Sequence, residues 1–83
     1  MKRPVYVIRD AAVGFGSPFI DINDASAKRN FAFAINNNND TMSYSPKDYD
    51  LYKLGEFDHE SGAFDLLPCP TMVVAGISVF TEK

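Results

Sequence analysis

YDLYKLGEFDHESGAFDL, at residues 49–66, is the stretch that decides the fold. Two runs rich in large apolar and aromatic residues, 51–57 and 63–66, flank a short polar segment that ends in Gly62. This arrangement is typical of a β-hairpin. The polar segment suits a type I turn followed by a glycine in the left-handed region of backbone conformation, where a residue without Cβ is favoured. The sequence therefore predicts two antiparallel strands joined by the loop 58–62.

Strand and loop signals precede the hairpin. Residues 4–9 are β-branched and aromatic, and their alternation predicts a strand that is buried on both faces at its centre. The segment 10–18 contains two glycines and a proline and predicts a loop. Its Gly-Phe-Gly sequence lacks the rest of a phosphate-binding fingerprint and indicates a tight turn instead. Residues 19–22 predict a short strand.

A helix is expected over residues 25–35, with Asn23 or Asp24 as its N-cap. Apolar side chains at a spacing of four residues form the stripe that should face a sheet, namely Ala27, Phe31 and Ile35. Phe33 lies about 200° from Phe31 around such a helix. We therefore expect Phe33 to contact a second surface, which could be a loop, another subunit or a nucleobase.

The rest of the chain predicts the fold class. Residues 36–47 are polar and predict a loop, and the prolines of 67–70 predict a rigid connector that breaks strand pairing. Residues 71–80 predict one strand, or two short strands hinged at Gly76. We expect an α+β fold in a single domain over residues 1–83, with one helix packed on a small antiparallel sheet in the order β-β-α-β-β-β, and a dimeric protein.

Composition and charge limit the classes of function. The formal charge is −3, but residues 1–30 carry +2 and residues 31–83 carry −5, so an anion-binding surface should lie in the N-terminal part. The single cysteine, Cys69, excludes an intramolecular disulfide, and its surroundings indicate a structural residue. No signal-peptide pattern is present, and the apolar run 72–80 is far shorter than the roughly 20 residues of a membrane helix. We expect a soluble cytoplasmic protein that does not bind membranes.

Residue patterns for catalysis are absent from the sequence. The single histidine, His59, lies between two acidic residues in the hairpin turn, without the further ligands that a metal site needs. Neighbouring carboxylates such as Asp48 and Asp50 are more typical of solvated loop edges than of an acid–base pair. We expect a binding or assembly protein that is not an enzyme and that uses no metal or other cofactor.

Aromatic residues make up 13 % of the chain, without tryptophan. Proteins that bind single strands combine such rings with cations, although a small aromatic core would look the same in sequence. Tyrosines tolerate half-exposed positions better than phenylalanines, which makes the four tyrosines the better candidates for base stacking, namely Tyr6, Tyr44, Tyr49 and Tyr52. We select Tyr6 and Tyr52 as site residues. The candidate phosphate contacts are the cations Lys2, Arg3, Arg9, Lys28 and Arg29, with Lys53 of the hairpin as a weaker addition.

The hairpin sequence resembles the small nonstructural protein of gokushoviruses, single-stranded DNA phages of the Microviridae. The resemblance covers residues 4–66. It rests on five segments: DYDLYKLGEFD at 48–58 followed by Gly62, the strand end at 9–10, GSPF at 16–19, the helix start at 24–25, and RNF at 29–31.

The resemblance implies a protein that binds single-stranded DNA during the switch from duplex replication to single-strand synthesis and packaging. It places the protein in the cytoplasm of a bacterial host, with phage replication or capsid proteins as further partners. The alternative function is a protein-interaction module that does not bind DNA and that contacts a host factor, or phage capsid or replication proteins, through Phe33 and the hairpin. A purely structural virion component is a third candidate. Salt dependence separates the first two, because phosphate-driven affinity falls steeply with salt.

Overall fold

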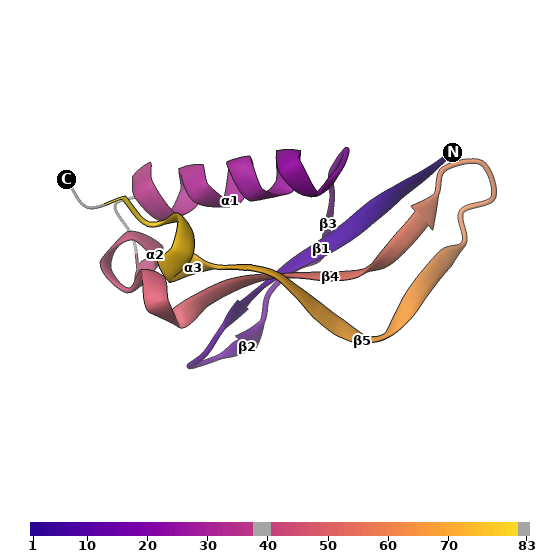
Figure 1. Ribbon diagram of the computed structural model, residues 1–83. Helices are drawn as coiled ribbons and strands as arrows, with labels where there is room; N and C mark the ends of the chain where they lie inside the picture. The colour runs from indigo at the N-terminus through magenta and orange to yellow at the C-terminus, as the bar shows by residue number, and fades with distance from the viewer. Residues whose placement is uncertain (38–40, 82–83) are drawn as a thin grey trace.

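The computed structural model describes residues 1–37 and 41–81 as an α+β fold, in which one long helix lies along one face of a curled antiparallel sheet (Figure 1). The elements are β1 Lys2–Asp10, β2 Gly14–Phe15, β3 Phe19–Ile20, α1 Asp24–Asn37, α2 Thr41–Tyr44, the 3₁₀ turn η1 Pro46–Asp48, β4 Tyr49–Asp58, β5 Phe64–Ala75 and α3 Gly76–Val79.

The sheet is organised around β1 and β4. Its strand order is β2-β1-β4-β5, with β3 also paired to β1, and all of these pairings are antiparallel. Cross-strand neighbours share a face of a sheet, and successive residues of a strand alternate between faces. We call the face that packs against α1 the inner face, and the opposite face the outer face. Tyr6 and Ile8 point to the inner face, whereas Val7 and Arg9 point to the outer face.

The main core lies between α1 and the inner face. The sequence prediction of the helical stripe is confirmed, because the three stripe residues are buried and Phe33 is 68 % exposed. The backbone N–H of Ser26 donates to Oδ1 of Asn23 across 2.8 Å, so Asn23 caps the helix. The core cluster comprises Tyr6, Ala27, Phe31, Ile35, Tyr49 and Leu51.

The predicted strand at 4–9 and the predicted hairpin are both confirmed. Val5 and Val7 are buried on the outer face while Tyr6 is buried on the inner face, so β1 is covered on both sides at its centre. In the hairpin loop the N–H of Gly62 donates to the carbonyl oxygen of Asp58 across 2.8 Å. The φ of Gly62 is +76°, the left-handed conformation that the sequence predicted.

The expected loop at 36–47 is wrong for most of the described residues, and its residues 38–40 lie outside them. The helix α1 continues to Asn37, because the side-chain amides of Asn36 and Asn37 donate back to the carbonyl oxygens of Ala32 and Phe33. A helical turn, α2, and the 3₁₀ turn η1 follow. Pro46 begins η1, where its fixed φ suits a first helical position.

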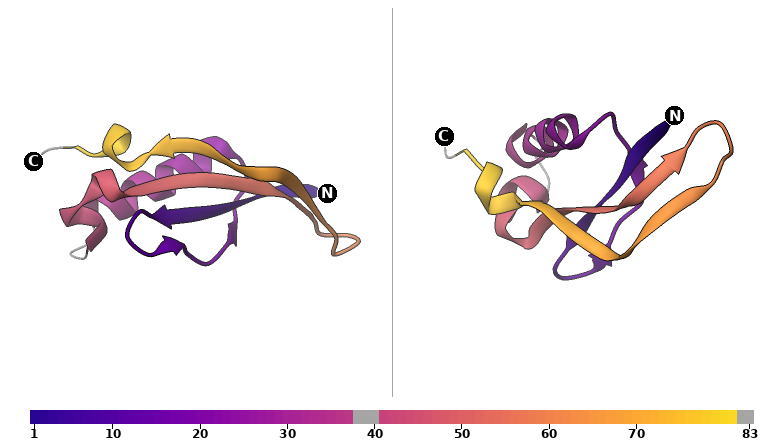
Figure 2. Two further views of the ribbon diagram at one scale, coloured as in Figure 1. Left: turned by 90° about the horizontal axis from the view of Figure 1, so that it is seen from below. Right: turned by 45° about the vertical axis from the view of Figure 1, so that its right-hand side comes forward.

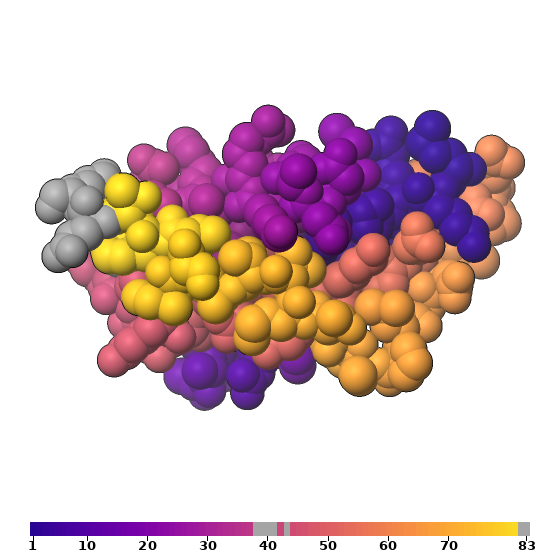
Figure 3. Space-filling view, viewed as in Figure 1, coloured from indigo at the N-terminus to yellow at the C-terminus, as the bar shows by residue number. Residues whose placement is uncertain are grey.

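The strand β5 differs from its prediction in the middle. Residues 67–70 belong to the strand, although the sequence predicted a separate connector. They have no partner in β4, because the pairing passes from Gly55↔Leu66 directly to Lys53↔Thr71. The prediction of broken pairing is therefore confirmed at these prolines. The side chains of residues 64–72 are exposed along the edge of the sheet (Figure 3), whereas Val73 and Val74 are half-buried against the core cluster.

A helical turn, α3, follows β5, so the expected strand over 71–80 stops at Ala75. Gly76 approaches the backbone so closely that an added Cβ would lie 2.2 Å from the carbonyl oxygen of Pro46. From there α3 folds back toward α1 (Figure 1). With β2 added and only two strands after the helix, the order is β-β-β-α-β-β when the short helical turns are omitted. Dimerisation stays a prediction.

Candidate nucleic-acid interface

Aromatic rings gather on the outer face near the β2 edge of the sheet. Tyr52 lies opposite Val7 in the register, and Phe15 lies opposite Arg9. The rings of Phe15 and Tyr52 meet edge to face, with centroids 5.5 Å apart, and the guanidinium carbon of Arg9 lies 6.0 Å from the Phe15 centroid. We call Arg9, Phe15 and Tyr52 the Phe15 cluster. Phe15 is 51 % exposed, so part of its ring surface is available to a ligand.

A second aromatic group lies on the same face at the hairpin end. Phe57 is opposite Arg3 in β1 and opposite Phe64 in β5. The ring centroids of Phe57 and Phe64 are 4.9 Å apart, and the His59 ring packs edge-on against Phe57 at 5.2 Å. We call Arg3, Phe57, His59 and Phe64 the Phe57 cluster. Each of the two clusters therefore combines exposed ring surface with one arginine.

Apolar residues of the outer face lie between the two clusters. Val5 and Val7 are buried there, whereas Ile20, Leu66 and Met72 are partly exposed. Along β1 the two arginines are separated by six residues, a span of about 20 Å at the rise of an extended strand. No helix crosses this face within residues 1–37 and 41–81 (Figure 2, left). The residues between the clusters on the outer face are Val5, Val7, Ile20, Leu66 and Met72.

Charge is distributed unequally between the two faces. On the outer face Asp50 is the carboxylate among the paired strand residues, and its Oδ1 accepts the N–H of Gly76 across 3.3 Å. Arg3 and Arg9 form no ion pair with any residue of the described segments. The paired residues of the outer face thus carry two arginines and one carboxylate, and this carboxylate, Asp50, lies opposite Arg9 in the register. The other carboxylates of the paired strands point to the inner side, namely Asp10, Glu56, Asp58 and Asp65.

The structure does not bring all of the predicted cations together. Lys2 and Lys53 lie on the inner side, in a shallow hollow beside the start of α1, and Lys2 Nζ is 3.7 Å from Oδ2 of Asp65. Lys28 and Arg29 lie exposed on α1. They occupy its second turn, beyond the first turn where the helix dipole attracts anions most strongly.

Tyr49 is buried in the core cluster and is one correction to the predicted stacking residues. Tyr6 is another. Its side chain is fully buried in the main core, which leaves no ring face for a base. Its hydroxyl donates to Oδ1 of Asp24 across 2.5 Å. Burial, and next the hydrogen bond to this carboxylate, raise the pKa of Tyr6. Tyr6 therefore stabilises the fold, whereas Tyr52 remains a candidate for contact with a base.

Sequence reasoning did not place Phe15, Phe57 and Phe64 on the face that carries Tyr52. Regular alternation along β4 would put Tyr52 and Phe57 on opposite faces, since they are an odd number of residues apart. The register between β1 and β4 shifts between Val5 and Tyr6, where Leu54 has no partner. This bulge brings Tyr52 and Phe57 to one face, and the extra residue is not visible in the hydrophobic pattern.

The described parts of the chain contain neither a metal-binding cluster nor a membrane-spanning helix. No group of three or more histidine, cysteine, aspartate or glutamate side chains lies close enough to hold a metal ion there. Among the same residues, no helix is long and apolar enough to span a membrane.

Comparison with known proteins gives one match. A family model described as "Phage ORF5 protein" matches residues 3–79. This match includes the Phe15 cluster, the Phe57 cluster, α1 and the hairpin. No curated protein and no solved structure matches the chain.

Proposed function

The chain belongs to the Phage ORF5 protein family, and we propose that it binds single-stranded DNA on the outer face of its sheet. We propose further that it does so without catalysing a reaction. The Phe15 cluster carries the proposal. It places a guanidinium without an ion-pair partner among the described residues beside an exposed phenylalanine ring and a tyrosine ring. Proteins that bind single strands combine these two features, namely aromatic faces for bases and cations for phosphates.

The distribution of charge makes this surface compatible with the acidic composition. Phosphates on the outer face would meet Arg3 and Arg9, whereas most strand carboxylates lie on the other side of the sheet. The strand layer has a low dielectric constant and screens the charge of those carboxylates only in part, so they still repel phosphates on the outer face. We therefore expect moderate affinity for single-stranded DNA that is measurable at low salt and falls as salt rises. Exposed ring surface favours unpaired bases, because bases within a duplex are already stacked on each other.

The role within the phage cycle rests on the sequence resemblance over residues 4–66. We propose that the protein acts in the cytoplasm of the bacterial host, at the switch from duplex replication to single-strand synthesis and packaging. A protein that coats nascent single strands would favour this switch by holding them apart from the complementary strand. Only moderate affinity is needed for this role, because the coat must be displaced when DNA is packaged.

Binding of a labelled oligothymidylate, followed by fluorescence anisotropy at low salt, tests the proposed function. Replacing Tyr52 by Ala should weaken binding about 5- to 100-fold, the effect of losing one base–aromatic stack. Tyr44→Ala is the matched control, because Tyr44 is 78 % exposed on α2, away from the outer face. The proposal fails if the unaltered protein does not bind, or if the two variants bind equally well.

The exposure of Phe33 favours a second candidate function. A phenylalanine that is 68 % exposed on the helix can dock a protein partner, such as a phage capsid or replication protein or a second copy of this chain. Phe33→Ser should then abolish this association and leave oligonucleotide binding unchanged. Sedimentation of the unaltered protein and of Phe33→Ser tests the self-association. If both proteins sediment as monomers at micromolar concentration, the self-association is contradicted.

A further inference from the structure

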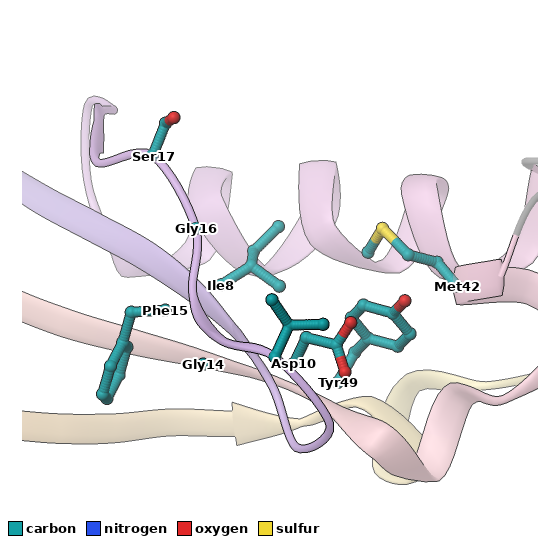
Figure 4. Close-up of a pocket in the computed structure, with 9 residues that line it drawn as sticks. Ile8, Asp10, Gly14, Phe15, Gly16, Ser17, Met42 and Tyr49 are labelled. Atoms are coloured by element: carbon teal, nitrogen blue, oxygen red, sulfur yellow. The ribbon is translucent and has the colours of Figure 1, made fainter.

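A cavity of about 360 Å³ lies on the inner side of the sheet, at the end where β1 turns into β2 (Figure 4). Its size falls within the range of sites that hold small organic ligands. Most of its wall is apolar, and polar side chains reach it at only a few positions. The lining residues are Ile8, Asp10, Val13, Gly14, Phe15, Gly16, Ser17, Met42 and Tyr49.

Asp10 is the charged residue among the described residues that line this cavity. Its Oδ1 accepts the N–H of Ala12 across 2.9 Å, and its carbonyl oxygen accepts the N–H of Val13 across 3.2 Å, so the residue also shapes the turn. Its second carboxylate oxygen has no hydrogen-bond or ion-pair partner within residues 1–37 and 41–81. Among the described residues, no lysine or arginine lines the cavity. The carboxylate of Asp10 accepts hydrogen bonds from a ligand with N–H donors, and the apolar wall suits a flat ring. A phosphate is disfavoured, because the carboxylate would repel it and no cation among the described lining residues would neutralise it.

The cavity and the outer face meet at the edge strand β2. Phe15 contributes to the cavity wall, while its ring points to the other side of the sheet, away from α1 (Figure 4). The strand consists of Gly14 and Phe15 alone, so the sheet is narrow at this edge. A Cβ added at Gly14 would meet nothing within 4 Å, which shows open space at the rim. A DNA strand stacked on Phe15 can therefore turn around this edge and place a neighbouring base on the inner side.

We propose that the cavity holds one guanine base of the bound strand, with Asp10 as the residue that determines the base preference. Guanine carries two adjacent donors on its Watson–Crick edge, N1–H and the N2 amino group, which match the two oxygens of a carboxylate. Thymine presents one N–H between two carbonyl oxygens that the carboxylate would repel. Cytosine and adenine each present one amino group beside an acceptor nitrogen. This inference rests on the proposed function, because the base is delivered by the strand on the outer face.

The three methionines of the chain allow the two sites to be observed separately. Met42 lines the cavity, Met72 lies on the outer face opposite Tyr52 and is 49 % exposed, and Met1 precedes β1. In NMR spectra of ¹³C-methyl-labelled protein, an oligothymidylate of about ten nucleotides should shift the Met72 signal. The same oligonucleotide with one central dG should shift Met42 as well, and should bind about 5- to 100-fold more tightly.

Asp10→Asn is the decisive variant. An asparagine oxygen can still accept the N–H of Ala12, so the turn is retained, but the second position becomes a donor that faces the donors of guanine. The preference for dG should fall to about 1-fold in this variant. Asp65→Asn is the control, because it also removes one negative charge from the inner side but lies away from the cavity. This variant should keep the preference for the oligonucleotide that contains dG.

The outcomes distinguish the two proposals. One outcome is that both oligonucleotides shift the Met72 signal, leave the Met42 signal unmoved and bind with equal affinity. This outcome would overturn the guanine site and leave single-strand binding intact. A Met42 shift and a dG preference that persist in Asp10→Asn would also overturn the role given to Asp10. The absence of any shift with either oligonucleotide would overturn the proposed function itself.

Discussion

The hydroxyl of Tyr6 joins the sheet to α1 through its hydrogen bond to Asp24, the first residue of that helix. Tyr6→Phe removes this bond and leaves the buried ring in place. We expect the free energy of unfolding to fall by about 1.5–3 kcal/mol, the range for a hydrogen bond to a charged group. Urea unfolding at neutral pH, followed by circular dichroism, measures the difference.

The pH dependence of this variant provides a second test. The pKa of Tyr6 is raised above the ordinary tyrosine value of 10.0 in the folded state. Its contribution to stability is therefore complete below pH 10 and is lost as the pH rises beyond that value. Tyr6→Phe lacks this proton, so the stability gap between the two proteins should stay constant from about pH 8 to about pH 10 and shrink from about pH 10 to about pH 11. A constant gap over the latter range contradicts the assignment.

Gly55 occupies a backbone conformation that only glycine adopts easily. Its φ is +155°, and an added Cβ would lie 2.3 Å from the carbonyl oxygen of Asp65 in the neighbouring strand. Gly55→Ala should destabilise the protein by at least about 2 kcal/mol, through strain together with the separation of β4 from β5. Gly62→Ala is the control, because its φ is also positive while its Cβ would meet nothing within 4 Å. We expect the control to cost about 1 kcal/mol, and equal urea midpoints for the two variants would refute the steric argument.

Among the elements, those with a strong local pattern were predicted from sequence. The hairpin of β4 and β5 has its turn glycine between two apolar runs, and α1 has its apolar stripe at a spacing of four residues. The short elements α2, α3 and β2 were missed. Their conformations depend on contacts with distant parts of the chain, such as the approach of Gly76 to the carbonyl oxygens of Pro46 and Tyr49. No window of neighbouring residues contains that information.

Asn36 connects α1 to α3 and provides a test of how the chain end is held. Its Nδ2 donates to the carbonyl oxygen of Val79 across 2.9 Å, and its Oδ1 accepts the N–H of Thr81 across 2.7 Å. Asn36→Ala should lower stability by about 1–3 kcal/mol, because these backbone groups lose their partner. It should also accelerate hydrogen exchange at the amides of Phe80 and Thr81 by NMR.

Asn37→Ala is the matched control for this prediction. The side chain of Asn37 donates to the carbonyl oxygen of Phe33 within the same helix and is exposed. Its loss should change the free energy of unfolding by no more than about 0.5 kcal/mol. If exchange at Thr81 is equally fast in the two variants, Asn36 does not anchor α3.

At the scale of the molecule, the sequence indicated the type of candidate surface but not its location. The count of cations placed it in the N-terminal 30 residues, and Arg3 and Arg9 do lie there. A count of charges cannot tell that Lys28 and Arg29 lie on a different side of the molecule from Arg3 and Arg9. They do so because α1 packs on the inner face of the sheet, opposite the outer face. The location of the surface depends on the bulge near Leu54 and on β2, both of which are products of tertiary packing.

This separation of cations leads to a prediction about salt dependence. If Arg3 and Arg9 contact phosphates, the double variant Arg3→Gln/Arg9→Gln should lower the slope of log affinity against log salt by about 1.4, since each single-strand phosphate contact contributes about 0.7. The control is Lys28→Gln/Arg29→Gln, which makes the same change in net charge on the exposed side of α1. Because the Debye length is about 8 Å at physiological salt, charges on the far side of the helix should alter the slope little. Anisotropy titrations of one oligothymidylate over a series of salt concentrations give the slopes. A larger loss of slope in the helix variant would place the DNA on α1 and refute binding at the outer face.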